Sequence, residues 1–393
     1  KFQLILYNWP MDIPVFEQLI KKIVTRSPLF DLGKTAVRLV INPRAGGFSR
    51  SGRLDVACAL LDRESQRREG YPACEPVSWE VLHTRASRHA TQLANDLLEQ
   101  AALNHNQDWL VILACGDGTT WEFLDGLTRA PDELLGRFTL LRLPMGTGND
   151  GSDGWTLEDS VSRLFEDGEV QRQPYVSILP AKTSRKLDDI RNGQFRAFNI
   201  ASIGLDAFVA HMTNKLKKVF PGDSFKLWLD LATVFYDSIY KTGTMKIRGT
   251  GTLAERPPQT KARKHAAIAE QQTERSFLLD GEFLLLAVGA DGNRTYGSHQ
   301  LILPDANNVC LVEKMGLFRK IQLKTPIVSG GHKQFPEVVL ASATELVAEY
   351  NRKILIQMDG ESVLLEPEDF PLTIRISQPV IRYLGRKDKR RHT

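Results

Sequence analysis

The stretch Trp109-Leu-Val-Ile-Leu-Ala-Cys-Gly-Asp-Gly-Thr119 decides the fold class of this chain. It begins with an apolar run from Trp109 to Ala114, which is typical of a β-strand that is buried on both faces. Gly116-Asp-Gly then ends the run, and a short helical pattern follows from Trp121 to Leu127. A buried strand that turns through glycines into a helix predicts one unit of a parallel α/β sheet.

The same alternation of strand and helix continues on both sides of this stretch. Further strands are predicted over Val37–Asn42, Trp79–His83 and Phe138–Leu143, and helices over Leu54–Arg67 and Ala86–Ala102. These elements predict a parallel-sheet domain over residues 35–155. Residues 1–34 are predicted to be an N-terminal extension with an amphipathic helix, and packing on the domain is favoured over a place in a membrane interface.

The pattern changes after residue 155. Short strand-like runs follow one another with few helices between them, which predicts an antiparallel β-sandwich over residues 156–376. One helical stretch, Phe225–Tyr240, interrupts the strands. The polar segment at about 253–274 is predicted to be an exposed insertion. Residues 386–393 form a basic tail.

Composition excludes several classes of protein. The 393 residues are 42% hydrophobic and 25% charged, as in ordinary globular proteins. The net charge of +4 is matched by the tail alone, so the body lacks the basic face of a nucleic-acid binder. No apolar run approaches the roughly 18 residues of a transmembrane segment. The four cysteines form no CxxC pair, which argues against a disulfide framework or zinc site and favours a reducing, cytoplasmic compartment.

Polar, glycine-containing turns follow each of the four predicted strands. The carboxyl ends of parallel strands share one edge of a sheet, and ligands bind outside that edge. Glycines let backbone N–H groups approach an anion, and a following helix adds its dipole, so the natural ligand is a phosphate. The turns are Asn42-Pro-Arg-Ala-Gly-Gly47, His83-Thr84-Arg85, Gly116-Asp-Gly-Thr119 and Met145-Gly-Thr-Gly-Asn-Asp150.

Phosphoryl transfer also needs a carboxylate and Mg²⁺. Asp117 is the best candidate, although a turn-forming role is equally open on pattern alone. Glu122 falls in the first turns of the following helix and faces the same edge. Taken alone, Asp150 is typical of a helix cap, and Asp359-Gly-Glu361 of a hairpin turn. The G-x-G-x-x-G match at Gly146–Gly151 is not interpreted as a dinucleotide site, because it does not follow the first strand.

Together these motifs resemble the diacylglycerol kinase catalytic-domain family, above all its bacterial lipid kinases, with sphingosine and ceramide kinases and, more distantly, NAD kinases as relatives. The resemblance runs in order over most of the chain. It rests on Asn42–Gly47, Gly116–Thr119 with Glu122, Leu143–Asp150, Phe198–Asp206 and Met358–Glu361. It implies a Rossmann-like nucleotide domain, joined by the segment at about 377–385, and a β-sandwich domain for the lipid, with the active site in the cleft between them.

The resemblance also implies roles for individual residues. Asp117 is expected to be the general base or a carboxylate linked to Mg²⁺, and Glu361 competes for the role of base. Asp150 and Asp206 are expected to contact the acceptor. ATP is expected to lie along Asn42, Gly46, Gly47, Thr84, Gly116, Gly118, Thr119, Glu122, Gly146, Thr147 and Asn149.

The chain departs from the family pattern at several positions. Cys115 replaces the first glycine of the Gly-Gly-Asp-Gly motif, and Ala45 replaces a serine of the first loop. The segment Pro304-Asp-Ala-Asn-Asn-Val309 lacks the Asp-Gly that follows in the family. That Asp helps to hold a structural magnesium in bacterial members, so the presence of this second magnesium site is left open.

We therefore expect an ATP- and Mg²⁺-dependent kinase of a lipid hydroxyl, cytoplasmic and peripherally bound to the membrane where its lipid substrate lies. The alternatives are a non-catalytic module that binds a nucleotide or lipid, and a soluble-substrate kinase of the NAD-kinase type. The sequence does not identify the acceptor lipid, and it leaves open whether the protein forms a homodimer.

Overall fold

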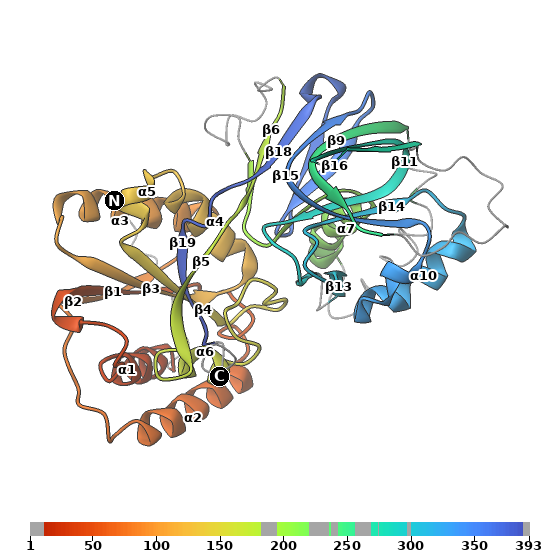
Figure 1. Ribbon diagram of the computed structural model, residues 1–393. Coiled ribbons are helices and arrows are strands. Elements are labelled where there is room, and N and C mark those ends of the chain that lie inside the picture. The colour runs from red at the N-terminus through yellow and green to blue at the C-terminus, as the bar shows by residue number, and fades with distance from the viewer. Residues whose placement is uncertain are drawn as a thin grey trace, which may run out of the picture. The chain divides into compact units, whose positions relative to one another are not determined.

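The computed structural model describes residues 12–181, 195–219, 236, 243–255, 269–273, 275–296 and 300–387 (Figure 1). The chain divides into two compact units. The first runs to Gln173 and resumes at Pro379, and the second spans Pro174–Gln378. The first unit thus continues past residue 155, because β5 and the short helix before it belong to its sheet and core.

A six-stranded sheet forms the centre of the first unit, in the order β2-β1-β3-β4-β19-β5. Neighbouring strands from β2 to β19 are parallel, and β5 runs antiparallel to β19. The predicted parallel sheet is therefore confirmed. The strands are β1 (Thr35–Ile41), β2 (Ser78–His83), β3 (Asp108–Cys115), β4 (Phe138–Pro144), β5 (Gly168–Gln173) and β19 (Ile381–Arg386).

Helices cover both faces of this sheet (Figure 1). On one face, α1, α2 and α6 share a core with the odd-numbered residues of β1 and with β3. On the other face lie α3, α4 and α5. The apolar side of α1 is buried, so this helix packs on the unit. The helices are α1 (Ile13–Val24), α2 (Ser51–Arg67), α3 (His89–Leu103), α4 (Asp117–Leu127), α5 (Asp132–Leu135) and α6 (Leu157–Ser162), with a 3-10 turn η1 (Leu32–Lys34).

The second unit is built on an eleven-stranded antiparallel sheet. Strand β9 pairs with both β11 and β15, and β14 also pairs with both, so these four strands close on themselves around an apolar core. The register shifts at Phe283/Leu285 in β11 and at Ala343/Glu345 in β15 are irregularities of the β-bulge kind, which bend a long strand. The predicted antiparallel β domain is therefore confirmed.

The strands of this sheet are β6 (Val176–Leu179), β7 (Phe195–Ala197), β8 (Ile200–Gly204), β9 (Thr244–Leu253), β10 (Ala269–Gln272), β11 (Ser276–Gly289), β14 (Val309–Glu313), β15 (Val338–Glu349), β16 (Ile354–Met358), β17 (Glu361–Leu365) and β18 (Leu372–Ile376). A separate hairpin joins β12 (Arg294–Tyr296) to β13 (Gln300–Leu303). The 3-10 turns are η2 (Gly331–Gln334) and η3 (Pro367–Asp369).

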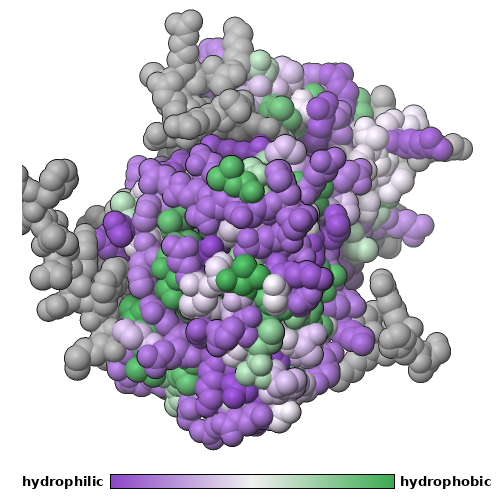
Figure 2. All heavy atoms as spheres, turned by 90° about the vertical axis from the view of Figure 1, so that its left-hand side faces the viewer, coloured by the Kyte–Doolittle hydropathy of each residue, from purple (hydrophilic) through white to green (hydrophobic). Residues whose placement is uncertain are grey.

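Two helices of the second unit are not apparent from the sequence pattern: α7 (Leu205–Val219) and α10 (Leu317–Ser329). The helix predicted over Phe225–Tyr240 lies outside the described residues except for Tyr236. Most of the insertion at 253–274, the first eleven residues and the tail from residue 388 also lie outside them. None of the helices within the described ranges is long and apolar enough to cross a bilayer. The face of the molecule in Figure 2 is mostly hydrophilic, with apolar side chains in small separate groups.

Candidate functional site

A side-chain hydrogen bond joins the loop after β1 to the first turn of α4, which follows β3. The Nδ2 amide of Asn42 donates to Oγ1 of Thr119 over 2.7 Å, and its own backbone N–H donates to the carbonyl of Ala114. The Oδ1 atom of Asn42 accepts the N–H of Arg44, which shapes the first loop. Asn42 therefore fixes the start of this loop against the N-terminus of α4.

The loops after β3 and β4 touch through their backbones. A Cβ atom on Gly146 would lie 2.6 Å from Cα of Gly116, closer than real Cβ contacts. The first loop approaches the same place, because the N–H of Gly47 donates to the carbonyl of Met145 and a Cβ on Gly46 would lie 3.0 Å from Oγ1 of Thr147. The structure thus gathers three of the four predicted turns at one edge of the sheet.

Asp117 is the first residue of α4, and its carboxylate is bound to the loop after β4. Oδ2 accepts the N–H of Asn149 over 2.8 Å, and Oδ1 accepts the N–H of Gly151 over 3.1 Å. Each carboxylate oxygen keeps further acceptor capacity after one such bond. The carboxylate is therefore oriented by the backbone and can still bind a ligand.

Asn149 gives the loop after β4 its shape. Its φ of +61° is left-handed, a conformation that Asn tolerates better than most residues. Its Oδ1 atom accepts the N–H of Gly146 over 2.7 Å, so the side chain closes the turn from Gly146 to Asn149. The next helix, α6, begins only at Leu157 and is capped by Thr156, so Asp150 is not a helix cap.

A second carboxylate lies beside Asp117. A Cβ on Gly148 would lie 2.8 Å from Oδ2 of Asp117 and 3.4 Å from Oδ2 of Asp150, so both oxygens flank the same glycine. One or two carboxylates with substrate phosphates are a usual set of ligands for Mg²⁺. The described residues contain no group of three or more candidate metal ligands. The carboxylate pair suits a magnesium ion that is bound largely through nucleotide phosphates.

The N-terminus of α4 points its backbone donors at the same loops. The N-cap residue is Gly116, which has no side chain to accept the first N–H groups of the helix. These donors and the helix dipole favour an anion at this end. Cys115 does not interfere, because it is buried beside Thr120 and burial raises the pKa of its thiol to about 12.

Two predicted ligand-binding residues lie toward the loop after β2. The backbone N–H of Thr84 donates to the carbonyl of Ile41, and Thr84 is buried. The Oε1 atom of Glu122 accepts a long hydrogen bond from the hydroxyl of Ser87, and the backbone carbonyl of Glu122 accepts one from Thr91. Glu122 therefore links α4 to the start of α3, and its contact with a nucleotide stays a prediction.

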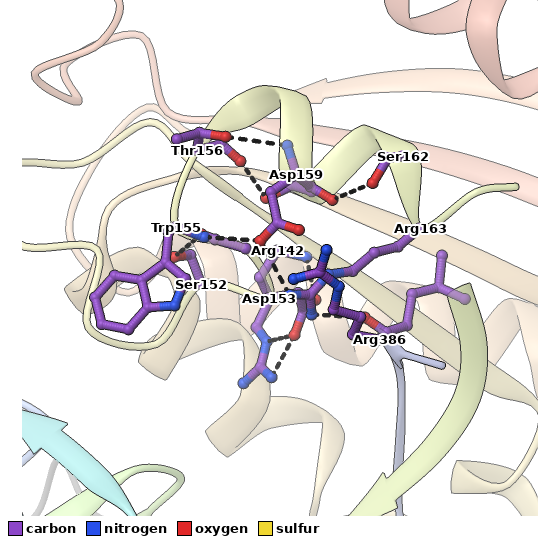
Figure 3. A network of polar contacts seen from close by, with 12 residues as sticks. Arg142, Ser152, Asp153, Trp155, Thr156, Asp159, Ser162, Arg163 and Arg386 are labelled. Atoms are coloured by element: carbon purple, nitrogen blue, oxygen red, sulfur yellow. Dashed lines mark hydrogen bonds and ion pairs between the residues drawn. The ribbon is translucent and has the colours of Figure 1, made fainter. Parts of the chain in front are cut away.

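A buried ion pair supports the loop after β4 from behind, and sequence reasoning missed it (Figure 3). Arg142 of β4 donates from Nε to Oδ1 of Asp153 over 2.8 Å, and its backbone N–H donates to Oδ2 over 2.6 Å. Both side chains are almost fully buried. The chain that leaves the candidate site is therefore fastened to the strand that enters it. A charged residue inside an otherwise apolar strand was the available signal.

Arg53 was missed as well. It lies in the first turn of α2, where a positive charge is unfavourable against the helix dipole. Its Nη1 atom lies 3.8 Å from the position that a Cβ on Gly46 would take, so the guanidinium borders the first loop. A guanidinium in this position suits a phosphate, because its planar fork of donors matches phosphate oxygens.

The turn that contains Glu361 belongs to the second unit, and its interpretation as a hairpin is confirmed. Strands β16 and β17 pair at Met358 and Glu361, with positive φ at both Asp359 and Gly360. The carboxylate of Asp359 accepts three backbone N–H groups at the start of β8, from Phe198, Asn199 and Ile200. Asp359 is thus a structural residue, and Glu361 is exposed beside it.

Asp206, in the first turn of α7, is connected to this hairpin. Its Oδ2 atom accepts the hydroxyl of Ser202 over 2.6 Å and the amide of Gln357 over 3.3 Å. The Oε1 atom of Gln357 in turn accepts the N–H of Gly360. Gln357 is fully buried and was not predicted as a site residue. The structure therefore groups Asp206 with the turn that leads to Glu361.

Comparisons with known proteins extend this picture. A Bacillus anthracis str. Sterne protein assigned as a diacylglycerol kinase is 19% identical and has a TM-score of 0.55, over 88% of this chain and 94% of its own. A second such structure, from the same organism, is 18% identical and has a TM-score of 0.51. The match covers 89% of this chain and 97% of the other. These similarities concern the fold alone. No curated protein matches the sequence.

The sequence profile of the diacylglycerol kinase catalytic domain matches residues 36–167. This range begins in β1, ends before β5, and contains all three loops that meet at Gly116 and Gly146. The resemblance inferred from the motifs is therefore confirmed for the part of the chain that carries the candidate site. Residues 36–167 belong to the diacylglycerol kinase catalytic-domain family.

Proposed function

We propose that this protein is an ATP-dependent kinase that transfers the γ-phosphate of ATP to the hydroxyl of a lipid of the diacylglycerol type. The observation that supports it most is the Asp117 carboxylate, held by two backbone N–H groups at the N-terminus of α4. There it faces loops whose glycines leave no room for side chains. A fixed carboxylate beside backbone donors is what phosphoryl transfer requires of a protein.

The triphosphate would lie across the three loops of the first unit. Backbone N–H groups of Gly118 and Thr119 would face it from the helix terminus, and Arg53 would add a positive charge from the side of Gly46. Bound with the nucleotide, Mg²⁺ would neutralise phosphate charge, with Asp117 and Asp150 as the carboxylates closest to it. Asn42 and Asn149 would act by holding these loops in place.

In the proposed reaction the acceptor oxygen forms a bond to the γ-phosphorus. The bond from that phosphorus to the bridging oxygen breaks, and ADP leaves. The hydroxyl proton passes to a carboxylate, for which Asp117 and Glu361 are the candidates. Asp206 is proposed to orient the acceptor, because it lies in the hydrogen-bonded group that leads to Glu361.

The lipid acceptor is proposed from the motif resemblance in the second unit, Phe198–Asp206 and Met358–Glu361. A kinase of a bilayer lipid must reach the membrane surface, and no helix in the described part of the chain can span a membrane. Peripheral association is therefore part of the proposal. A soluble acceptor of the NAD type and a binding role without catalysis remain the competing functions, and the test below separates them.

The test uses γ-labelled ATP, Mg²⁺ and a lipid extract dispersed in mixed micelles, with parallel reactions that contain NAD instead of lipid. We expect a labelled lipid from the wild type and none from Asp117→Asn. The amide would present an NH₂ group to one of two backbone N–H donors and cannot accept a proton. Asp96→Asn, on the exposed face of α3, is the matched control and should keep full activity.

Glu361→Gln identifies the base. If Glu361 accepts the proton, this variant should lose turnover while its ATP binding, measured by calorimetry, is unchanged. Labelled NAD in place of lipid would favour the soluble-substrate kinase. ATP binding without any labelled product would favour the binding role. Near-normal turnover by Asp117→Asn would contradict the proposed site.

A further inference from the structure

The exposed apolar side chains of the second unit are concentrated on one helix. Five large apolar side chains are exposed in its described part, and four of them lie on α10. Phe318 is 85% exposed, Val328 56%, Ile321 55% and Leu317 42%. Single exposed apolar residues are normal on a soluble protein, but four on one helix are not.

These four residues form one row along α10. Leu317, Ile321 and Val328 are four and seven residues apart, which places them above one another on a helix, with Phe318 beside them. The helix is thus apolar toward the outside as well as toward the core. This explains why the sequence pattern did not predict it. In Figure 1, α10 lies at the outer edge of the second unit near β13 and β14.

The opposite side of α10 is anchored, so the row cannot turn inward. Leu323 is buried in the core, and Ile327 packs against the same cluster. Arg319 forms a two-bonded ion pair with Glu337 and lies over the ring of Phe335 at 4.4 Å. Gly330 ends the helix in a left-handed conformation. The row therefore faces away from the core on an anchored helix.

The charged residues in the sequence segment that contains the row are all basic. From Lys314 to Gln334 there are five Lys or Arg and no Asp or Glu. Lys314 pairs with Glu282, Arg319 with Glu337 and Lys333 with Asp305, each from another element. Lys320 and Lys324 lie on the helix and border the apolar row. A helix with apolar side chains outward and lysines along their border suits an anionic lipid surface.

We infer that α10 is a membrane-docking helix, which inserts Phe318, Ile321 and their neighbours into the interface of an anionic bilayer while its lysines contact the headgroups. The inference rests on the proposed function in that a lipid kinase must reach a bilayer. The docking itself needs neither ATP nor an acceptor, so it can be tested without turnover.

The first experiment measures co-sedimentation of the full chain with vesicles of phosphatidylcholine, with and without phosphatidylglycerol. We expect binding to require phosphatidylglycerol. Phe318→Ser and Ile321→Ser should each weaken it about tenfold, as expected for an apolar side chain that leaves a lipid environment. Lys320→Gln with Lys324→Gln should weaken it by about an order of magnitude at low salt, and by much less near 1 M salt, where charges are screened.

The control is Leu103→Ser, which removes an 82% exposed apolar side chain from α3 in the first unit and should leave binding unchanged. A second readout uses Phe318→Trp. Its added fluorescence should shift to the blue and be quenched by lipids brominated on the acyl chain. Folding of each variant is checked by its circular dichroism and melting temperature.

Vesicle binding that is equal in Phe318→Ser, Ile321→Ser and the wild type would overturn the inference. A second result would also overturn it. If sedimentation shows that the wild type is a dimer, and these substitutions dissociate the dimer without changing vesicle binding, the row is a protein interface. Asp117→Asn should bind vesicles normally. A chain that docks through α10 but phosphorylates no lipid would refute the proposed function and leave this inference standing.

Discussion

Gly146 and Gly116 meet so closely that a Cβ atom on Gly146 would lie 2.6 Å from the Cα atom of Gly116. We expect Gly146→Ala to push the loops after β3 and β4 apart. Because Asp117 is bound to the second of these loops, its carboxylate should lose its orientation. Turnover should fall at least about a hundredfold, as is typical when reacting groups are misplaced by about 1 Å.

The matched control is Gly52→Ala in the first turns of α2. A Cβ there would meet nothing within 4 Å, and alanine favours a helix by about 0.5–1 kcal/mol over glycine. This variant should be as active as the wild type and slightly more stable. Equal activity of the two alanine variants would show that the contact between Gly116 and Gly146 does not matter for the site.

Asn149 combines a left-handed backbone with a hydrogen bond from its side chain to Gly146. Two substitutions separate these contributions. Asn149→Gly keeps the backbone conformation and loses the hydrogen bond, whereas Asn149→Ala loses both. We expect ATP binding, measured by calorimetry, to weaken in the order wild type, Asn149→Gly, Asn149→Ala. Tighter binding by the alanine variant than by the glycine variant would contradict the backbone argument.

The parts of the fold that local pattern reveals were predicted from sequence. Strands β1, β3 and β4 are buried along nearly their whole length, so each is a visible apolar run that ends at a polar turn. Strand β5 was missed, because it lies at the edge of the sheet and reads Gly-Glu-Val-Gln-Arg-Gln, with only partial burial. An edge strand shows little apolar pattern, and its partner β19 comes from the far end of the chain.

Some residues of the candidate site could likewise be predicted from local sequence, and others could not. Asp117 and the glycines were found because a turn after a buried strand identifies them locally. The partners of Asp117 could not be derived, since they are backbone N–H groups of a different loop. Gln357 and Asp153 were missed for a related reason. Each is an ordinary polar residue in sequence and becomes significant only when folding places it against Asp206 or Arg142.

The pair of Arg142 and Asp153 should be essential to the stability of the first unit. Both side chains are nearly buried, so removal of one partner leaves a charge without compensation. Asp153→Asn or Arg142→Met should therefore destabilise the unit by about 3–5 kcal/mol. The double variant should be less destabilised than the sum of the two. Denaturation of all four proteins measures this coupling. Strictly additive effects would mean that the two charges do not depend on each other.

His332 should make the second unit sensitive to acid. Its side chain is fully buried, near Ile302, Cys310, Asp305 and Lys333. Burial lowers the pKa of this imidazole, although its backbone hydrogen bonds and Asp305 act the other way. A group with a lower pKa in the folded than in the unfolded state binds fewer protons when folded, so stability rises with pH. The stability that the neutral, buried imidazole contributes is complete above its unfolded pKa of about 6.5. It is lost as the pH falls through the folded pKa.

We therefore expect hydrogen exchange of β14 and β15, corrected for its intrinsic pH dependence, to accelerate as the pH falls below about 6.5. His332→Gln can still donate to the carbonyl of Ile302 but does not titrate, so this acceleration should be smaller in the variant. His105→Gln replaces an exposed histidine of the first unit and should follow the wild type. If His332→Gln shows the same pH dependence as the wild type, the acid sensitivity comes from other groups. His332 would then bind protons equally in the folded and unfolded states, to within the precision of the measurement.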